Sequence, residues 1–223
     1  MTTRPNKRRI LVVDDHPIVR ERLAEIINKE SDLMVCGQAE SRAQTLSLIN
    51  KAKPDLVLLD LNLTDSKGTD FIKELIAANP DLVILVISMH DESLFAERSI
   101  RAGARGYITK QEATKDILTA LRKVLAGDVY LNDETTHRLI TKMAGGTSAG
   151  ITGPNADELS DREMQVFRMI GLGISTRQIS EELNLDVSTI DTYRKRIKDK
   201  LNLKDASELL SYAISWVRAT GQQ

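Results

Sequence analysis

The stretch "PDLVLLDLNLTD", residues 54–65, decides the fold of the N-terminal half of the chain. Four consecutive apolar side chains, Leu56–Leu59, run into the carboxylate of Asp60, and a polar loop follows. A short, continuous apolar run is typical of a strand that is buried on both faces of a parallel sheet. A buried strand that finishes in a carboxylate predicts a functional group held rigidly at one rim of that sheet.

The same pattern recurs along residues 8–126, where short β-branched runs alternate with longer amphipathic ones. The expected strands are 10–13, 33–37, 56–59, 83–87 and 106–109. The expected helices lie near 17–30, 41–52, 68–78, 91–102 and 112–126. This alternation predicts a doubly wound α/β domain, a flavodoxin-like five-stranded parallel sheet with strand order 2-1-3-4-5.

The composition changes after Gly127. Residues 127–157 are expected to form a linker, because "AGGTSAGITGPNA" (144–156) holds four glycines and a proline, although one more short helix could precede it. Residues 158–220 contain no convincing strand and are expected to form a second, all-α domain. Its helices should lie near 161–171, 176–183, 187–201 and 205–218, and capping boxes at Ser160/Glu163 and Ser175/Gln178 should start the first two.

Composition limits the classes of function. A chain of 223 residues is long enough for two domains, and its formal charge of −1 means that any affinity for nucleic acid must come from a local basic face. No apolar run approaches the ~18 residues of a membrane span. The lone Cys36 cannot form an intramolecular disulfide. We expect a cytoplasmic protein with no membrane segment.

Polar groups follow four of the five expected strands. Asp14 and Asp15 follow the first, Asp60 the third, Ser88 the fourth and Lys110 the fifth. Ligands of open parallel sheets bind at the carboxyl ends of the strands. Three carboxylates there repel one another unless a cation lies between them, and Mg²⁺ prefers such oxygen ligands. With a lysine and a hydroxyl beside them, these groups suit an aspartyl phosphate. Individually, each residue could instead be a helix cap or a surface residue.

The motifs "ILVVDDHPIVRERL", "DLVLLDLNL", "VILVISMHD" and "GARGYITK" resemble, in this order, the receiver domain of two-component response regulators. The resemblance implies that Asp60 accepts a phosphoryl group from a sensor histidine kinase. It also implies that Mg²⁺ is held by Asp14, Asp15, Asp60 and the backbone carbonyl of Asn62. One departure is Thr64, where the family often has proline.

The resemblance assigns three more residues of the receiver. Ser88 and Lys110 would bind the phosphoryl oxygens, and Tyr107 would be the aromatic residue whose burial follows the movement of Ser88. Adding roughly −1.5 to −2 charge units at Asp60 should draw Ser88 and Lys110 inward. The surface formed by residues 91–102 and the fifth strand would then change shape.

A phosphatase is the main alternative from another class. "DLNLT" (60–64) nearly matches the DxDxT signature of haloacid dehalogenases, in which the first aspartate is a nucleophile and the second is a general acid and base. This chain has Asn62 at the second position, and an amide cannot shuttle a proton. A phosphoryl group on Asp60 should therefore persist long enough to act as a signal.

The segment "TRQISEELNLDVSTIDTYRKRIKDKL" has the pattern of a helix-turn-helix. Its second helix carries an apolar stripe and, on the opposite face, Arg194, Lys195 and Lys198. This is the local basic face that the net charge conceals. A basic, solvated helix face with no partner is the simpler alternative.

Residues 159–216 are similar to the DNA-binding domain of the LuxR/NarL family. The similarity implies that base edges of double-stranded DNA are faced by Asp191, Thr192 and Lys195. It implies phosphate contacts for Ser188, Thr189, Tyr193 and Arg194. Asp191 departs from the family, which commonly has a neutral or basic residue there. Its carboxylate could accept from a cytosine amino group or pair with Lys195.

Together the two resemblances predict a phosphorylation-controlled DNA-binding transcription regulator that is not an enzyme. Phosphorylation of Asp60 is expected to release the C-terminal domain through the linker and to permit homodimerisation on DNA. In the family the last helix, "DASELLSYAISWVRAT", can pair two such domains, so an exposed apolar face on it would be a dimer surface. A regulator that acts through protein contacts without phosphorylation is a third possibility.

Overall fold

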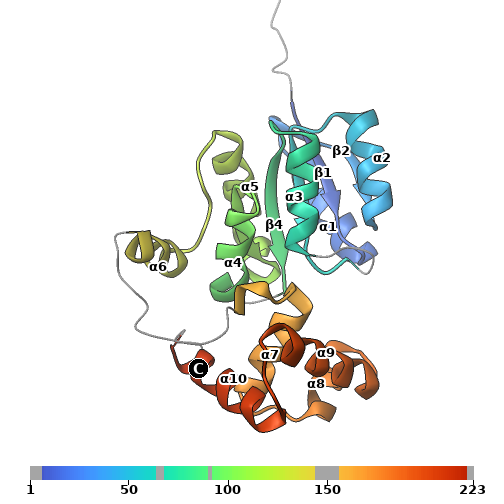
Figure 1. The fold of residues 1–223 in the computed structure, drawn as a ribbon. Helices are drawn as coiled ribbons and strands as arrows, with labels where there is room; N and C mark the ends of the chain where they lie inside the picture. Colours follow the sequence, from blue (N-terminus) through green and yellow to red (C-terminus); the bar gives the residue numbers. More distant parts are fainter. Residues whose placement is uncertain (1–6, 64–67, 90–91, 144–155, 220–223) are drawn as a thin grey trace, which may run out of the picture. The chain divides into compact units, whose positions relative to one another are not determined.

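The computed structural model describes residues 7–63, 68–89, 92–143 and 156–219. The chain divides into two compact units, and the boundary between them lies between Leu139 and Ile140. The first unit holds the sheet, and the second is helical (Figure 1). The glycine-rich residues 144–155, in which a flexible linker is expected, lie outside the described residues.

The first unit is built on a five-stranded parallel sheet. Its strands are β1 (Arg8–Val13), β2 (Leu33–Ala39), β3 (Leu56–Asp60), β4 (Val83–Ser88) and β5 (Gly106–Thr109). Their order is β2-β1-β3-β4-β5, which confirms the predicted topology. The side chains of β3 are all buried, as expected for a central strand that is covered on both faces.

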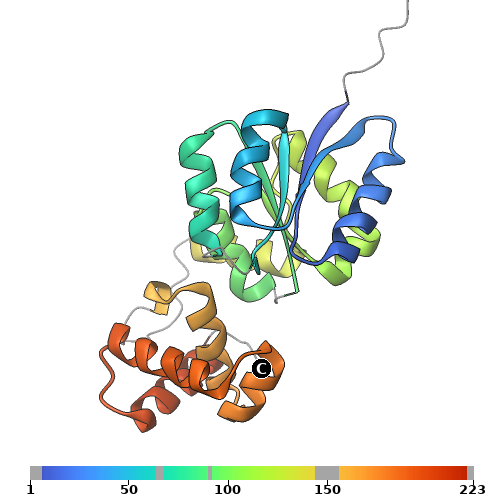
Figure 2. The same cartoon turned by 90° about the vertical axis from the view of Figure 1, so that its right-hand side faces the viewer.

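Helices cover both faces of the sheet. They are α1 (Pro17–Asn28), α2 (Arg42–Ala52), α3 (Thr69–Ala78), α4 (Glu92–Arg101) and α5 (Lys110–Leu125). Figure 2 shows α1 and α5 on one face and α2 and α3 on the other. The side chains of α1 and α5 share one apolar cluster with alternate residues of the strands, for example Ile10, Leu58 and Ile108. This two-sided packing makes the sheet a rigid mount.

The register of the strands brings the polar residues to one rim. Val13 pairs with Leu59, so Asp14 and Asp60 follow at the same level on neighbouring strands. Asp60 in turn pairs with Ile87, the residue before Ser88. Ser88 pairs with Thr109, the residue before Lys110. Asp14 and Asp60 are therefore level, Ser88 and Lys110 each lie one residue further along their strands, and the four groups form a row.

A capping box between Thr109 and Glu112 starts α5 at Lys110. Beyond the end of α5, a backbone bridge and one more helix extend the first unit. After α5 the chain returns to the free edge of β5, where Tyr130 forms an isolated bridge with Gly106. Helix α6 (Asp133–Met143) follows at once and crosses the boundary between the two units.

The second unit is all-α, as predicted. A 3₁₀ turn (Ala156–Glu158) precedes α7 (Asp161–Gly171), α8 (Thr176–Leu183), α9 (Val187–Lys200) and α10 (Ala206–Ala219). The capping boxes predicted for α7 and α8 are both present. The aromatic ring of Phe167 on α7 lies 5.7 Å from those of both Tyr212 and Trp216 on α10, which joins the first and last helices of this unit.

On α10 the structure divides the apolar residues. Leu209, Ala213 and Val217 are buried, whereas Leu210 is 42% exposed. The first three thus belong to the core of this unit. Ile214 and Trp216 are partly buried, and Leu210 is the most exposed large apolar side chain of α10.

Candidate functional site

The predicted acidic site lies at the carboxyl rim of the sheet. Asp14 comes from the end of β1 and Asp60 from the end of β3, and both are buried. Ser88, which closes β4, is buried as well. Buried polar side chains at three adjacent strand ends are costly unless they are paired or perform a function. Their placement distinguishes this rim from an ordinary set of turn residues.

Lys110 joins two of these carboxylates. Its Nζ lies 2.6 Å from Asp14 Oδ2 and 2.7 Å from Asp60 Oδ2, and its side chain is only 10% exposed. Burial alone would lower the pKa of Lys110, but the negative charges of Asp60 and Asp14 outweigh it and raise that pKa. Lys110 is therefore a permanent cation that already contacts Asp60 before any phosphoryl group arrives.

The pKa of the Asp60 carboxyl is raised above its usual range. Burial is the main cause; the charge of Lys110 opposes it, and the nearby carboxylate of Asp14 adds to it. The carboxylates of Asp14, Asp15 and Asp60 face the single ammonium group of Lys110, so negative charge remains in excess. A bound cation would relieve this excess and favour the ionised form of Asp60.

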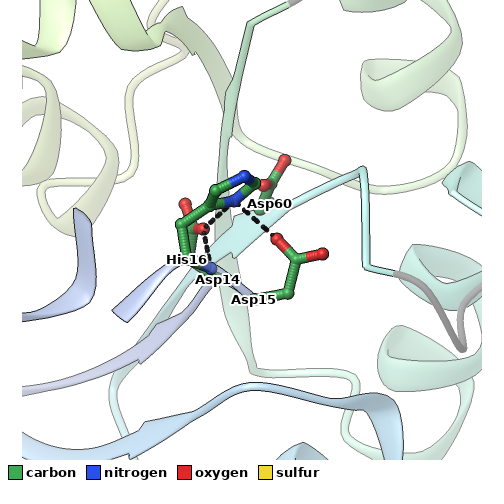
Figure 3. Close-up of side chains that lie close together, drawn as sticks. All are labelled: Asp14, Asp15, His16 and Asp60. Atoms are coloured by element: carbon green, nitrogen blue, oxygen red, sulfur yellow. Dashed lines mark hydrogen bonds and ion pairs between the residues drawn. The ribbon is translucent and has the colours of Figure 1, made fainter. Parts of the chain in front are cut away.

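Figure 3 shows the group that could hold this cation: Asp14, Asp15, His16 and Asp60. One potential ligand atom from each residue lies within 4.8 Å of the others. A set that consists mainly of carboxylate oxygens at the rim of a sheet suits Mg²⁺. The donor set therefore fits the metal that the sequence predicts.

His16 is a member of this group that the sequence reasoning missed. Its Nδ1 lies 2.7 Å from Asp15 Oδ1 and 3.1 Å from Asp14 Oδ1, and its backbone N–H donates to Asp14 Oδ1. Its position directly after the aspartate pair in "DDHP" was the available signal. The ring is 65% exposed, so it lies at the mouth of the site.

Asn62 lies in the loop after β3. Its backbone N–H donates to Asp60 Oδ1 at 3.0 Å, which orients the carboxylate. The metal contact that is predicted for its carbonyl oxygen stays a prediction. Thr64, the departure from the family pattern, lies outside the described residues.

Tyr107 is completely buried in this structure, although it belongs to the edge strand β5. The expected link between its burial and the movement of Ser88 concerns a second state and stays a prediction. The predicted inward movement of Lys110 has a defined starting point here, because Lys110 Nζ already lies 2.7 Å from Asp60 Oδ2.

The second candidate surface is one face of α9. Asp191, Thr192 and Lys195 are exposed, as is Ser188, whereas Ile190 and Ile197 are buried on the opposite side. Among the described residues neither Asp191 nor Lys195 takes part in an ion pair, so both side chains face solvent. Of the predicted phosphate contacts, Thr189, Tyr193 and Arg194 are partly covered.

The turn before α9 is fixed by the backbone. Asn184 ends α8 in the left-handed region with φ 52°, and the N–H of Leu185 donates to the carbonyl of Ser180 at 2.9 Å. Arg194 on α9 donates to Thr176 Oγ1 on α8 at 3.1 Å. The two helices are thus held at a defined angle, which is the arrangement of a helix-turn-helix.

Comparison with known protein families identifies both parts of the chain. The response regulator receiver domain matches residues 10–122, and the family of bacterial regulatory proteins called the luxR family matches residues 157–213. The chain belongs to the two-component response regulators. This response regulator combines a receiver domain with a LuxR-type DNA-binding domain, and its family consists of transcription regulators rather than classical enzymes.

Relatives match this response regulator along nearly the whole chain. Response regulator GacA of Pseudomonas aeruginosa is 32% identical over 206 residues, which cover 92% of this chain and 95% of the relative. Oxygen regulatory protein NreC of Staphylococcus carnosus is 29% identical over 209 residues, which cover 92% and 96%. The two-domain organisation is therefore shared with these relatives.

Solved structures show the same fold. RcsB from Salmonella enterica serovar Typhimurium bound to promoter rprA has a TM-score of 0.58 at 24% identity, covering 94% of this chain and 99% of that chain. A LuxR-family response regulator from Aurantimonas sp. has a TM-score of 0.57 at 29% identity, covering 62% of this chain and 99% of that chain.

Within the residues that the structure describes, the helices are too short or too polar to span a membrane.

Proposed function

We propose that Asp60 is the phosphoacceptor of this response regulator, that a sensor histidine kinase is its donor, and that phosphorylation controls binding of α9 to double-stranded DNA. The observation that carries the proposal is the buried contact of Lys110 Nζ with both Asp60 and Asp14. This contact places a fixed positive charge beside a carboxylate that lies at the rim of the sheet, where phosphoryl groups are bound in such folds.

The transfer is an in-line displacement at phosphorus. One carboxylate oxygen of Asp60 attacks the phosphorus atom of a phosphohistidine on the kinase, and a new P–O bond forms. The P–N bond breaks, and its electron pair returns to the imidazole nitrogen of the kinase. Lys110 moves from the carboxylate to a phosphoryl oxygen, where its charge stabilises the transferred group. The hydroxyl of Ser88 donates to another of these oxygens.

Mg²⁺ would be held by Asp14, Asp15, Asp60 and the backbone carbonyl of Asn62. When bound, it neutralises charge on the phosphoryl oxygens and lowers the barrier to transfer. Asp14 is buried and therefore a fixed member of this set, whereas Asp15 is partly exposed. His16 lies close enough to orient both aspartates through its ring and its backbone N–H.

DNA recognition is assigned to α9. Asp191, Thr192 and Lys195 would face base edges, since they occupy the exposed side of the helix. The predicted phosphate contacts are Ser188, Thr189, Tyr193 and Arg194, and Lys198 belongs to the same basic face. Leu210 on α10 offers a site for homodimerisation, as it is the exposed apolar residue of that helix.

The experiment is phosphorylation of the purified full-length chain with Mg²⁺ and acetyl phosphate, followed by intact-mass measurement. Wild type should gain the mass of one phosphoryl group, and Asp60→Asn should gain none. Asp55→Asn is the matched control, because Asp55 lies before β3 at the opposite end of the strand and should react like wild type. Equal labelling of Asp60→Asn and wild type would contradict the proposal.

The phosphatase alternative is tested in the same preparation. A regulator should release at most one phosphate per chain from a small phosphoester, whereas a phosphatase would show continued turnover. DNA affinity is then measured before and after phosphorylation by fluorescence anisotropy, on sites selected from random DNA. An equal affinity for wild type and Asp60→Asn under phosphorylating conditions would support a regulator that acts without phosphorylation.

A further inference from the structure

The free edge of β5 is closed by the segment that leads out of the receiver. Tyr107 N–H donates to the carbonyl of Tyr130 at 2.9 Å, and Tyr130 N–H donates to the carbonyl of Arg105 at 3.0 Å. Tyr130 thereby forms a one-residue parallel bridge with Gly106. This bridge, here called the Tyr130 latch, connects the linker side of the receiver directly to the backbone of the predicted switch residue Tyr107.

The close approach of the latch depends on Gly106. A Cβ atom at this position would lie 2.9 Å from the carbonyl oxygen of Tyr130 and 2.9 Å from Leu85 Cδ1. Neither contact is sterically acceptable, and the first involves backbone, which cannot rotate away. A side chain at Gly106 would thus push Tyr130 off the strand. Glycine at position 106 leaves the space that the Tyr130 backbone occupies.

The latch also determines where α6 begins. Asn132, two residues after Tyr130, caps this helix: its Oδ1 accepts from Thr135 N–H at 2.8 Å, and its carbonyl accepts from Thr136 N–H at 3.0 Å. Between the bridge and the cap there is one residue, so the start of α6 is tied to β5. The ring of Tyr130 packs against the core cluster, 5.8 Å from Lys123 Nζ.

The lateral support of β5 is unequal on its two sides. Toward the centre of the sheet it pairs with β4 along its whole length, from Gly106 to Thr109. On its outer side, among the residues that the structure describes, the latch is its backbone partner, while Thr109 N–H is used by the Glu112 side chain. β5 is therefore paired through four residues on its inner side and, in the part of the chain that the structure describes, through a one-residue bridge on its outer side.

We propose that phosphorylation opens the Tyr130 latch and so releases the start of α6 from β5. The inference rests on the proposed function, because it requires a phosphoryl group on Asp60. That group must fit between Asp60, Ser88 and Lys110, and Lys110 follows β5 directly. Tyr107 is already completely buried, so its side chain cannot move further out of solvent on its face of the sheet. The displacement is absorbed where the strand is least supported, at its outer edge.

Hydrogen–deuterium exchange of the full-length chain tests the latch, since the amides of Tyr107 and Tyr130 are its two donors. The probe is acetyl phosphate with Mg²⁺, and intact mass counts the phosphoryl groups in the same sample. Exchange over residues 128–143 should accelerate on the order of tenfold when the chain is phosphorylated. Exchange in β1 and β3 should stay the same.

Two outcomes separate this inference from the proposed function. A mass shift with unchanged or slower exchange over residues 128–143 overturns the latch alone. An absent mass shift overturns both, because no phosphoryl group then reaches Asp60.

Two variants isolate the backbone donor. Tyr130→Pro removes the N–H that donates to Arg105, whereas Tyr130→Ala removes the ring but keeps the N–H. Without phosphodonor, Tyr130→Pro should already show fast exchange over residues 131–143 and no further response, while Tyr130→Ala should still respond. Equal behaviour of the two variants would overturn the role of the bridge. Gly106→Ala provides an independent route to the same open state.

Discussion

Lys110 Nζ lies 2.7 Å from Asp60 Oδ2, and both groups are buried at the rim of the sheet. This pairing has a cost as well as a benefit, because a buried charge that loses its partner is left uncompensated. The stability of the receiver is therefore coupled to the same residues that are proposed to bind the phosphoryl group.

Lys110→Met tests this coupling. It leaves Asp14 and Asp60 buried without their cation, so the free energy of unfolding in urea should fall by about 3–5 kcal/mol without metal. Added Mg²⁺ should restore part of the loss, since binding to the folded state stabilises it. Lys115→Met, exposed on the same helix, is the control and should change stability little. An equal loss with and without Mg²⁺ would count against a metal site here.

Asp15→Asn should have opposite effects on stability and metal binding. Removing one of three neighbouring carboxylates relieves repulsion and should raise the metal-free unfolding free energy by about 0.5–1 kcal/mol. Mg²⁺ affinity, measured by isothermal titration calorimetry, should fall about tenfold or more. The contact with His16 survives, because an amide oxygen still accepts a hydrogen bond. If Asp15→Asn bound Mg²⁺ like wild type, Asp15 would not be a ligand; Asp116→Asn, exposed on α5, serves as the control.

The DNA-binding unit contains a partly buried ion pair between Glu163 and Lys200, with a predictable pH dependence. Burial alone would raise the pKa of Glu163, but hydrogen bonds from Lys200 (2.6 Å) and from Ser160 outweigh it and lower that pKa below its ordinary value of 4.5. The contribution of Glu163 is therefore complete above about pH 4.5 and is lost as the pH falls through the lower, folded-state pKa.

Glu163→Gln should reduce the unfolding free energy of this unit by about 1–2 kcal/mol at neutral pH, since Lys200 is partly exposed. The difference from wild type should shrink below pH 4.5 in thermal melts followed by Trp216 fluorescence. Glu182→Gln, exposed on α8, is the matched control. A difference that stays constant with pH would show that the charge of Glu163 is not its cause.

Lys195→Ala tests base reading by α9. If Lys195 faces a base edge, binding-site selection should show a changed preference at one or two base pairs, equivalent to about 1–3 kcal/mol. Lys204→Ala removes an exposed lysine outside the helix and should leave the preference unchanged. An unaltered preference with uniformly weaker binding would reassign Lys195 to phosphate.

Gly171→Ala should disrupt the packing of α7 on α10. A Cβ atom there would lie 2.5 Å from the carbonyl oxygen of Ala213 and 2.6 Å from Val217 Cγ2, so the helices must separate. The expected loss is about 1–3 kcal/mol in the unfolding free energy, with a weakened edge-to-face contact of Phe167 with Trp216 visible in near-ultraviolet circular dichroism. Gly173→Ala meets open space and should cost about 1 kcal/mol, from its positive φ alone. Equal losses would contradict the packing argument.

The sequence was sufficient for the features that repeat or that follow the strands. The apolar run Leu56–Leu59 predicted a central strand, and the rule that ligands bind at strand ends brought Asp14, Asp60 and Lys110 together before any distance was known. The capping boxes of α7 and α8 were readable for the same reason, since they depend on residues three apart. The Thr109/Glu112 capping box has the same three-residue spacing but was not predicted. The predicted start of α5, residue 112, is therefore two residues later than its observed start at Lys110.

Features that depend on one contact between distant residues were not readable. Tyr130 bridges Gly106 through backbone groups, which carry no side-chain pattern, and a one-residue strand has no periodicity. Glu163 was predictable as a cap, but its ion pair with Lys200 joins residues 37 positions apart. His16 stood beside the aspartate pair, yet only the start of α1 decides that its ring turns back toward them.

The rigid turn at Asn184 has a thermodynamic consequence for recognition. Because backbone hydrogen bonds and the contact between Arg194 and Thr176 already fix α8 against α9, little conformational entropy is left to lose when α9 enters a groove. The α8–α9 unit should then bind DNA nearly as a rigid body. Ordering of the protein would therefore contribute little to the binding enthalpy measured by calorimetry. Beyond the base contacts proposed for Asp191, Thr192 and Lys195, discrimination between DNA sites should then depend on the energy needed to fit the DNA groove to a helix that does not change shape.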